Sequence, residues 1–437
     1  MSTVQQSVQE FFRKHGMWHG DIDMAEGVQT FIGEMEAGLQ GSPKSLMMIP
    51  AFVDAGSDIP MNEPVIVIDA GGTNFRVCLI TFTVNGAVIE HHQNYPMPGA
   101  REPISRDKFF ETIAERLLPV LDRSNKIGFC FSYPTEIQPN GDGRLIRFSK
   151  EVRAEGVEGQ LIGAGLLETL KSMGHKCDHS IVLLNDTVST LLGGMAAQVG
   201  RPFDSYVGFI LGTGTNTCYI ERNSNITKLP DHRTDGTMII NIESGAYTNL
   251  KQGDIDREYD AGSTNPGTYL NEKMISGGYF GGLALRVLHH AAREGLFSAA
   301  AAPAILALDK LTTKDITDYV SNPYNKDEGV VGALLRSDDD FLTAYWLFDG
   351  LYERAARLVA VSMAAVVTKT GRGGNPCKPV CVAAEGTMFS KARLFRQKLD
   401  YYMRSFVEGE QGLYIEYVTV ENSVLLGTAI AGLQFQK

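Results

Sequence analysis

Hydrophobic residues follow two different spacings along the chain. Short apolar runs at 65–70, 127–131 and 181–184 ("VIVIDA", "IGFCF" and "IVLL") are typical of buried strands. Apolar positions at helical spacing occupy 25–41 and much of 267–370. Because strands alternate with helices, the pattern predicts an α/β fold.

One part of this pattern occurs twice. Residues 65–80 read "VIVIDAGGTNFRVCLI" and residues 206–221 read "YVGFILGTGTNTCYIE". Each copy has two apolar strands joined by a bend of small and hydroxyl-bearing residues. After the first copy, Asn85-Gly86 is the favoured signal of a two-residue hairpin turn and predicts a third strand. The repeat indicates a chain of two related halves.

Composition and charge narrow the class of protein. The 437 residues exceed a typical single domain, and 43% hydrophobic with 21% charged residues is ordinary for a globular protein. A net charge of −11 argues against a nucleic-acid or anionic-membrane partner. We find no run of about 18 apolar residues and no signal-peptide pattern. The six cysteines lack zinc-site spacing, so we expect reduced thiols in a cytoplasmic protein.

The two bends have a composition suited to binding an anion. In "DAGGTN", glycine allows backbone N–H groups to converge on one point. A single bend of this kind is more simply a tight hairpin. Two of them in a two-halved α/β chain favour a clamp for nucleotide phosphates. The sequence contains neither a P-loop nor a GxGxxG fingerprint between strand and helix.

Three charged residues have both a structural and a functional interpretation. Asp69 ends its strand just before the first bend, where a carboxylate can hold Mg²⁺ through water. Arg76 could offset phosphate charge or be an exposed strand residue. Asp186 follows an apolar strand within Asn185-Asp186-Thr187, and all three residue types favour helix N-caps. Capping is therefore the simpler explanation of Asp186 by itself, and a general base facing a cleft is the alternative.

Longer motifs resemble those of one family. "DAGGTNFRV" resembles the first phosphate motif of hexokinases, and "GFILGTGTNTCYIE" resembles the second. The segments "FSYP", "NDTVST", "INIESGAY", "NPGTYLNEKMISG" and "AAEGT" occur in hexokinase order, and the resemblance runs from about residue 26 to the C-terminus. It implies a duplicated, two-lobed actin-like ATPase fold, with ribonuclease H-like α/β domains around a central cleft. The expected small lobe is 62–186 plus 422–437, and the expected large lobe is 1–61 plus 187–421.

The resemblance also implies roles for individual residues. Asp186 would be the catalytic base, with Lys150 and Arg76 stabilising charge, and Asp69 would hold Mg²⁺. The residues that would contact the sugar are Ser132, Ser149, Lys150, Asn185, Asp186, Asn216, Glu243 and Glu272. The residues that would contact the nucleotide are Asp69, Gly71, Gly72, Thr73, Asn74, Arg76, Gly212, Thr213, Gly214, Thr215, Gly386, Thr387 and Ser423.

The chain departs from the family pattern near both substrates. Phe148 stands where the family has Trp, and Glu151-Val152 stands where it has Gly-Phe. Ser244 replaces the Trp of the family's Glu-Trp-Gly, and Glu385 replaces the Asp of its nucleoside loop. These changes leave the sugar preference and the nucleotide choice open.

The implied activity is ATP- and Mg²⁺-dependent phosphorylation of a hexose at its 6-hydroxyl, most simply D-glucose, at the first step of glycolysis. We expect a monomer or homodimer that binds small molecules and neither nucleic acid nor membrane. The alternatives are a kinase for mannose, fructose or an amino sugar, a catalytically silent sugar sensor, and an actin-like or chaperone ATPase. The presence of Asp186, Lys150 and Asp69 argues against the sensor, and the set of sugar residues argues against the ATPase.

Overall fold

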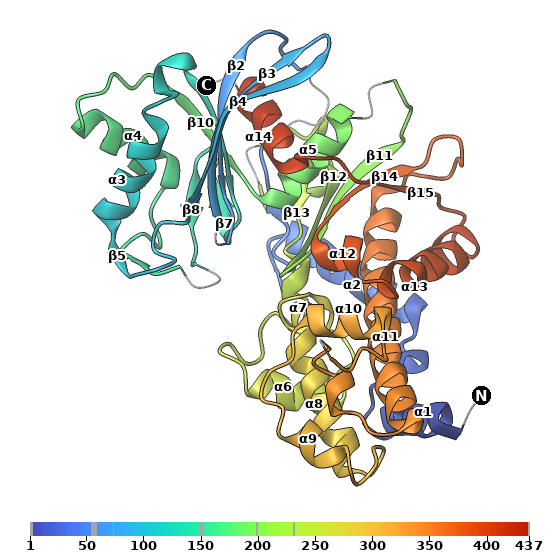
Figure 1. The fold of residues 1–437 in the computed structure, drawn as a ribbon. Helices are drawn as coiled ribbons and strands as arrows, with labels where there is room; N and C mark the ends of the chain where they lie inside the picture. Colours follow the sequence, from blue (N-terminus) through green and yellow to red (C-terminus); the bar gives the residue numbers. More distant parts are fainter. Residues whose placement is uncertain are drawn as a thin grey trace.

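The computed structural model describes residues 3–53, 59–72, 74–148, 152–197, 200–229, 232–327 and 329–435. Two β-sheets form the centres of two lobes (Figure 1). The sheet of the small lobe has the strand order β10-β6-β2-β3-β4, and that of the large lobe has the order β1-β13-β12-β11-β14-β15. The small pairs β5 (Ile104–Ser105) with β9 (Ala154–Glu155) and β7 (Thr135–Ile137) with β8 (Gly143–Leu145) lie outside both sheets.

The strands of the small lobe are buried on both faces, except for the edge strand β4, whose residues are mostly exposed. They are β2 (Pro64–Ala70), β3 (Asn74–Thr83), β4 (Gly86–Pro96), β6 (Lys126–Phe131) and β10 (Ser180–Leu184). Along β2, Ile66 and Ile68 belong to one hydrophobic cluster, while Val65 and Val67 belong to another. The helices α3 (Arg106–Leu117) and α4 (Ile162–Ser172) cover the first face (Figure 1). Burial on both faces explains why the strand sequences are continuous apolar runs.

The turn between β3 and β4 differs by one residue from the prediction. Thr83 pairs with Gly86, so Val84 and Asn85 form the turn in place of Asn85-Gly86. The Thr83 hydroxyl accepts from the Asn85 N–H at 3.2 Å and donates to the Gly86 carbonyl at 2.9 Å. This side chain closes the turn early, and Gly86 takes a positive φ of 112° as the first residue of β4.

The large lobe repeats the topology of the small one. Its strands are β1 (Ile49–Pro50), β11 (Ser205–Leu211), β12 (Thr215–Arg222), β13 (Thr237–Asn241), β14 (Val380–Glu385) and β15 (Ile415–Val418). In each sheet an antiparallel meander (β2-β3-β4 or β11-β12-β13) is followed on its other side by two parallel strands (β6-β10 or β14-β15). The predicted duplication of an α/β unit is therefore confirmed. The exact lobe boundaries stay a prediction.

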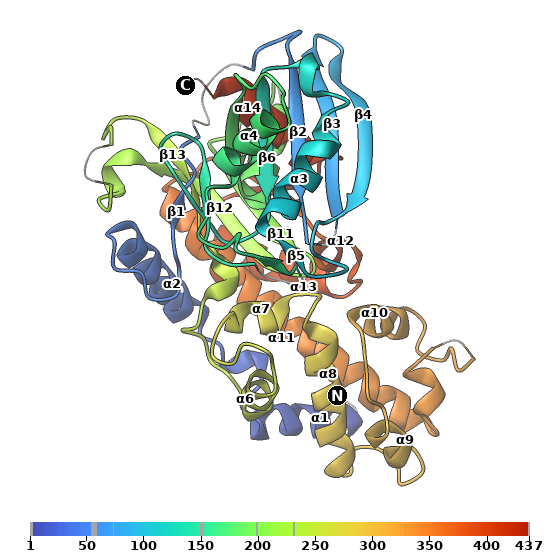
Figure 2. The same cartoon turned by 90° about the vertical axis from the view of Figure 1, so that its left-hand side faces the viewer.

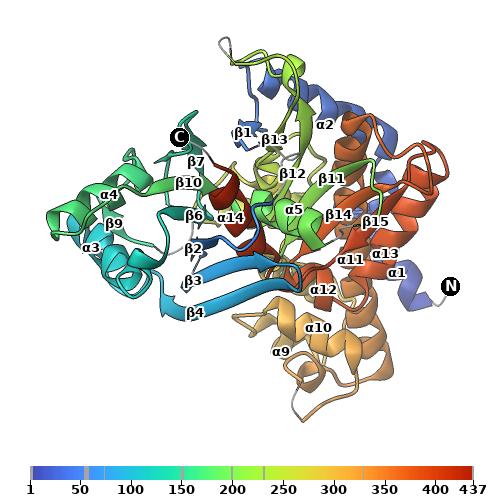
Figure 3. The ribbon, with the colours of Figure 1, turned by 90° about the horizontal axis from the view of Figure 1, so that it is seen from above.

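Two helices cross between the sheets. They are α5 (Asp186–Ala197) and α14 (Ser423–Gln434), which lie side by side in Figures 1 and 3. A Cβ atom added to Gly427 would lie 1.8 Å from the Ser189 carbonyl oxygen, and one added to Gly193 would lie 2.2 Å from the Ser423 carbonyl oxygen. The hydroxyls of Ser189 and Thr428 are 3.0 Å apart at the same crossing. The two backbones therefore meet where only glycine fits.

Helices form the rest of the large lobe. They are α1 (Thr3–Lys14), α2 (Met24–Leu39), α6 (Asp254–Ala261), α7 (Leu270–Ile275), α8 (Phe280–Arg293), α9 (Ala302–Leu306), α10 (Thr313–Ser321), α11 (Asp338–Thr370), α12 (Thr387–Lys391) and α13 (Phe395–Tyr402). The long helix α11 packs against α1 and α2 (Figure 2). It begins at a Ser337–Asp340 capping box and ends at Gly371 in the left-handed conformation. Among the described residues, no helix has both the length and the apolar character needed to cross a bilayer.

Candidate active site

The two glycine-containing bends follow β2 and β11. In the first, the Gly71 N–H donates to the Asn74 carbonyl at 3.0 Å, and the Tyr133 hydroxyl donates to the Gly71 carbonyl at 3.0 Å. In the second, the Gly212 N–H donates to the Gly214 carbonyl at 2.9 Å. Thr73 lies outside the described residues.

The nucleoside loop predicted after β14 packs on the second bend. Gly386 has a φ of 115°, and a Cβ atom there would lie 2.2 Å from the Leu211 carbonyl oxygen. Thr387 follows as the first residue of α12. Thr213 is exposed, whereas Thr215 is buried and its hydroxyl donates to the Ile210 carbonyl at 3.0 Å. The bend after β11 and the loop after β14 thus form one continuous surface.

An ion pair lies beside the first bend. The register of β2 and β3 sets Asp69 opposite Arg76, whose Nε donates to Asp69 Oδ2 at 2.7 Å. Asp69 is only 3% exposed, and burial raises the pKa of its carboxyl group. Arg76 lowers that pKa and the nearby Asp186 raises it. This burial and this neighbouring charge are typical of a functional carboxylate.

A third carboxyl group belongs to the same electrostatic cluster. Burial raises the pKa of Glu385, and the charges of Asp186 and Asp69 raise it further. The hydroxyl of Ser423 donates to Glu385, and this hydrogen bond and the charge of Arg76 lower the pKa. Asp69 belongs to the small lobe and Glu385 to the large lobe, so the cluster spans the space between the two sheets.

Asn185 is the N-cap residue of α5. The Thr187 N–H donates to Asn185 Oδ1 at 2.9 Å, while Asp186 is the half-buried first residue of the helix. The capping explanation of Asp186 is therefore wrong, because its neighbour fills that role. A carboxylate in the first turn of a helix interacts favourably with the positive end of the helix dipole.

A network of amides extends from Asn185 into the large lobe. Asn216 Nδ2 donates to Asn241 Oδ1 at 2.8 Å and to Asn185 Oδ1 at 3.2 Å. Asn241 Nδ2 donates in turn to Glu243 Oε1 at 2.8 Å. The Ser244 N–H donates to Asn216 Oδ1 at 3.2 Å. These contacts orient the polar atoms of the predicted sugar residues Asn185, Asn216 and Glu243 toward one another.

Glu272 is held from a different direction. Its Oε2 accepts the Thr215 N–H at 2.9 Å, and a Cβ atom on Gly214 would lie 2.5 Å from the same oxygen. Glu272 lies in the first turn of α7, and Glu243 precedes a short 3-10 turn in the left-handed conformation with φ of 59°. The second bend and a predicted sugar carboxylate are thus in direct contact.

A pocket between the lobes borders this network. Its small-lobe wall contains Phe131, Tyr133 and Thr135, and its large-lobe wall contains Ile49 and Asn241; Asn185 also lines it. Ser132 belongs to the same strand end, where its N–H donates to the Ala70 carbonyl at 3.1 Å. Ser149 and Lys150 lie outside the described residues.

The sequence did not reveal two groups near this site. Asn241 bridges Asn216 and Glu243, and its place at the end of β13, two residues before Glu243, was the available signal. Arg147 crosses to the large lobe, where its guanidinium donates to the Tyr269 hydroxyl at 2.8 Å and lies 5.1 Å from the ring centroid. No local pattern predicts that pair.

Family models named hexokinase match residues 10–196 and 206–434. The chain belongs to the hexokinase family. It is 30% identical to Hexokinase-2 of Homo sapiens over 419 residues, which is 89% of this chain and 44% of that protein. It is 28% identical to Hexokinase-1 of Schizosaccharomyces pombe over 420 residues, covering 92% and 85% of the two chains. The chain thus spans about half the length of the mammalian relatives that it matches.

The hexokinase from Schistosoma mansoni, solved in complex with glucose, has the same fold. Its TM-score with this chain is 0.80 at 22% sequence identity, and the match covers 99% of this chain and 100% of that one. The predicted two-lobed hexokinase fold is confirmed by this likeness. Within the hexokinase fold, Ser244 is buried and its hydroxyl is 3.1 Å from that of Thr217, so a polar contact occupies the position of the family's Trp.

Proposed function

We propose that this hexokinase-family chain transfers the γ-phosphoryl group of ATP to the 6-hydroxyl of a hexose, most simply D-glucose, at the first step of glycolysis. The observation that carries the proposal is the position of Asp186. This residue begins α5 next to the Asn185–Asn216–Glu243 network, and it lies within electrostatic reach of Asp69 beside the first bend. A carboxylate there has a sugar-type site on one side and a phosphate-type site on the other.

A hexose is recognised through its hydroxyl groups. Glu243 and Glu272 are carboxylates that accept hydrogen bonds, and Asn185 and Asn216 are amides that both donate and accept. Their positions are fixed before ligand binds by the contacts to Asn241 and Thr215. A sugar that lacks one hydroxyl would leave a buried polar group unpaired, which disfavours its binding. Ser132 lies at the neighbouring strand end, and we infer that Ser149 and Lys150 complete the sugar site.

Proton transfer and phosphoryl transfer then follow. Asp186 accepts the proton of the 6-hydroxyl, and the sugar oxygen attacks the γ-phosphorus. The bond from phosphorus to the bridging oxygen breaks, and ADP leaves with that electron pair. The transition state is loose, so positioning and charge stabilisation supply most of the catalysis. Arg76 contributes positive charge beside the first bend, and Lys150 would contribute it from the sugar loop.

Phosphates would be bound by the two bends and the nucleoside loop. The contributing residues are Asp69, Gly71, Gly72, Thr73, Asn74, Arg76, Gly212, Thr213, Gly214, Thr215, Gly386, Thr387 and Ser423. Backbone N–H groups of such turns suit phosphate oxygens. In this chain Ser423 would act on the nucleotide site through Glu385, to which its hydroxyl donates.

The acidic cluster fits a magnesium ion. The charge of Asp186 raises the pKa of both Asp69 and Glu385, and carboxylate oxygens are preferred Mg²⁺ ligands. Asp69 would hold the ion through water. When bound, Mg²⁺ supplies positive charge to the phosphate oxygens.

We further propose a cytoplasmic monomer or homodimer with no nucleic-acid or membrane partner. All six cysteines are free thiols, which suits a reducing compartment. The hexose could instead be mannose, fructose or an amino sugar, because Ser244 and Phe148 alter the family's sugar-site pattern.

The test is a coupled assay of ADP release with ATP, Mg²⁺ and a panel of hexoses. We expect turnover that requires a hexose and Mg²⁺, with glucose among the best acceptors. ADP release that is equally fast without a hexose would contradict the proposal and favour an ATPase. Sugar binding without turnover would favour a sensor.

A further inference from the structure

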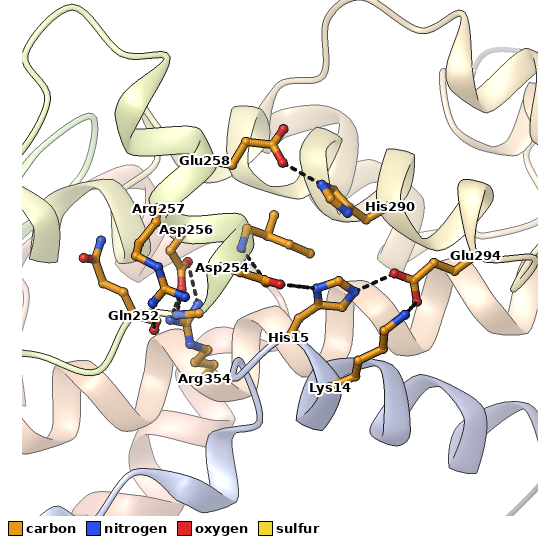
Figure 4. Close-up of polar contacts among 12 residues, drawn as sticks. Lys14, His15, Gln252, Asp254, Asp256, Arg257, Glu258, His290, Glu294 and Arg354 are labelled. Carbon is orange, nitrogen blue, oxygen red and sulfur yellow. Dashed lines mark hydrogen bonds and ion pairs between the residues drawn. The ribbon is translucent and has the colours of Figure 1, made fainter.

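A histidine and carboxylate cluster lies far from the active site, where α1, α6 and α8 meet (Figures 2 and 4). His15 follows α1 and is only 6% exposed, while His290 and Glu294 lie one turn apart at the end of α8. His15 Nε2 is 2.9 Å from Glu294 Oε1. Ligand atoms of His15, His290 and Glu294 all lie within 4.8 Å of one another. Ligand atoms around one tetrahedral ion with bonds of about 2 Å lie about 3.3 Å apart, so the widest pair would close by up to about 1.5 Å and the His15–Glu294 pair would separate slightly.

Each histidine already has a carboxylate on one of its ring nitrogens. His15 Nδ1 is 2.9 and 3.0 Å from the two oxygens of Asp254, the first residue of α6. His290 Nε2 is 2.7 Å from Glu258 Oε2. Metal-binding histidines characteristically donate their second N–H to such a carboxylate, which fixes the ring and strengthens the ligand. Both histidines therefore have the support that a metal site needs.

The hydrogen bonding of His15 is compatible with such a site. The imidazolium form donates to both Asp254 and Glu294, whereas the neutral form, which is the one that binds metal, has a single N–H donor. With the Nδ1 proton donated to Asp254, the Nε2 lone pair faces Glu294 Oε1. A cation between these two atoms would satisfy both. Lys14 does not block it, because its Nζ contacts the other oxygen, Glu294 Oε2, at 2.7 Å.

We propose that His15, His290 and Glu294 bind a divalent transition metal of the zinc type. Two imidazoles and a carboxylate suit zinc, with water as the fourth ligand. His290 and Glu294 are about one-quarter exposed, which gives the ion a path from solvent. The ion would join the N-terminal helix to α6 and α8, so its role is structural and separate from phosphoryl transfer.

The experiment uses the full chain after metal removal, titrated with Zn²⁺ by calorimetry and with Co²⁺ by visible absorption. We expect one ion per chain, a tetrahedral Co²⁺ spectrum and a raised melting temperature. His290→Gln and Glu294→Gln should each weaken binding at least tenfold, in line with lost ligands. Gln at 290 can still donate to Glu258, which keeps that contact.

His289→Gln is the matched control. His289 is the adjacent residue of α8, and its Nε2 contacts the Leu308 carbonyl at 3.1 Å, away from the cluster. This variant should bind Zn²⁺ as the parent does. Absence of binding in the parent at micromolar Zn²⁺, or parent-like binding by both His290→Gln and Glu294→Gln, would overturn the proposal. The test needs no catalytic activity and is independent of the proposed reaction.

Discussion

The two sheets share a strand order but carry different groups beside their bends. In the small lobe, the hairpin pairs Asp69 with Arg76, so opposite charges flank the first bend. In the large lobe, the hairpin pairs Leu211 with Thr215, and neutral amides with two glutamates surround the second bend. Under the proposed function, one scaffold would supply charge for phosphate chemistry in one copy and hydrogen-bonding groups for a polyol in the other. A reaction that needs both sets requires the lobes to act together.

The sharpest test of this division concerns Asp186, at the junction of the lobes. Asp186→Asn removes the proton acceptor but keeps the shape, so we expect kcat to fall about 10²–10⁴-fold with hexose binding largely intact. Steady-state kinetics and glucose binding by calorimetry measure the two effects. A near-normal kcat would remove Asp186 from the role of base.

The next test concerns the backbone contact that joins the lobes. Gly427→Ala forces a Cβ atom against the Ser189 carbonyl, so we expect a loss of about 1–3 kcal/mol in unfolding free energy. The control is Gly33→Ala in α2, where a Cβ atom would meet nothing within 4 Å. That change should stabilise the protein by about 0.5–1 kcal/mol, because alanine favours helix. Denaturant-induced unfolding measures the unfolding free energy of both variants. Equal changes in the two variants would contradict the close contact between α5 and α14.

Substitutions in the large lobe should separate sugar from nucleotide. Glu243→Gln and Glu272→Gln each replace an acceptor by a mixed donor and acceptor, so we expect hexose use to weaken by about 1–3 kcal/mol. ATP binding should change much less. Equal losses of binding free energy for hexose and ATP would indicate a folding defect and would not support a division of roles between the lobes.

Closure of the lobes should give a smaller effect, a change in the overall dimensions of the protein. A hexose that contacts both lobes binds the closed form better, and only this difference shifts the equilibrium. We expect glucose alone to reduce the radius of gyration in small-angle scattering. Lys150→Met should lower kcat more than it weakens sugar binding to the open form. An unchanged scattering profile at saturating glucose would favour a preformed, rigid site.

A further expected effect lies outside both bends. Burial lowers the pKa of Lys228 to about 8, and its Nζ donates to the Met47 and Met48 carbonyls at 3.0 and 2.6 Å. A free lysine titrates near 10.4, so the unfolded chain binds more protons between about pH 8 and 10.4, and this group's contribution to stability rises with pH there. The unfolding free energy of the parent relative to Lys228→Met should therefore increase from pH 8 to 10. A constant difference would contradict the lowered pKa.

Local patterns predicted the repeated strands and bends because burial on both faces requires apolar runs. They did not assign the cap of α5, since Asn185, Asp186 and Thr187 all qualify and only the hydrogen bond from the Thr187 N–H to Asn185 Oδ1 separates them. The contact between Arg147 and Tyr269 and the bridging role of Asn241 depend on tertiary folding. Thr73, Ser149 and Lys150 lie outside the described residues, so their roles stay predictions.

The crossing of α5 and α14 also sets how far each group travels when the lobes rotate. Ser189 at the contact is three residues from Asp186, a rise of about 4.5 Å along the helix. For a rotation of the lobes about this crossing, the displacement of an atom increases with its distance from the rotation axis. Asp186 lies close to this axis, whereas side chains at the rim, such as Arg147, lie farther from it. Under the proposed function, Asp186 would therefore stay nearly still while the far edge of the cleft moves over the substrate.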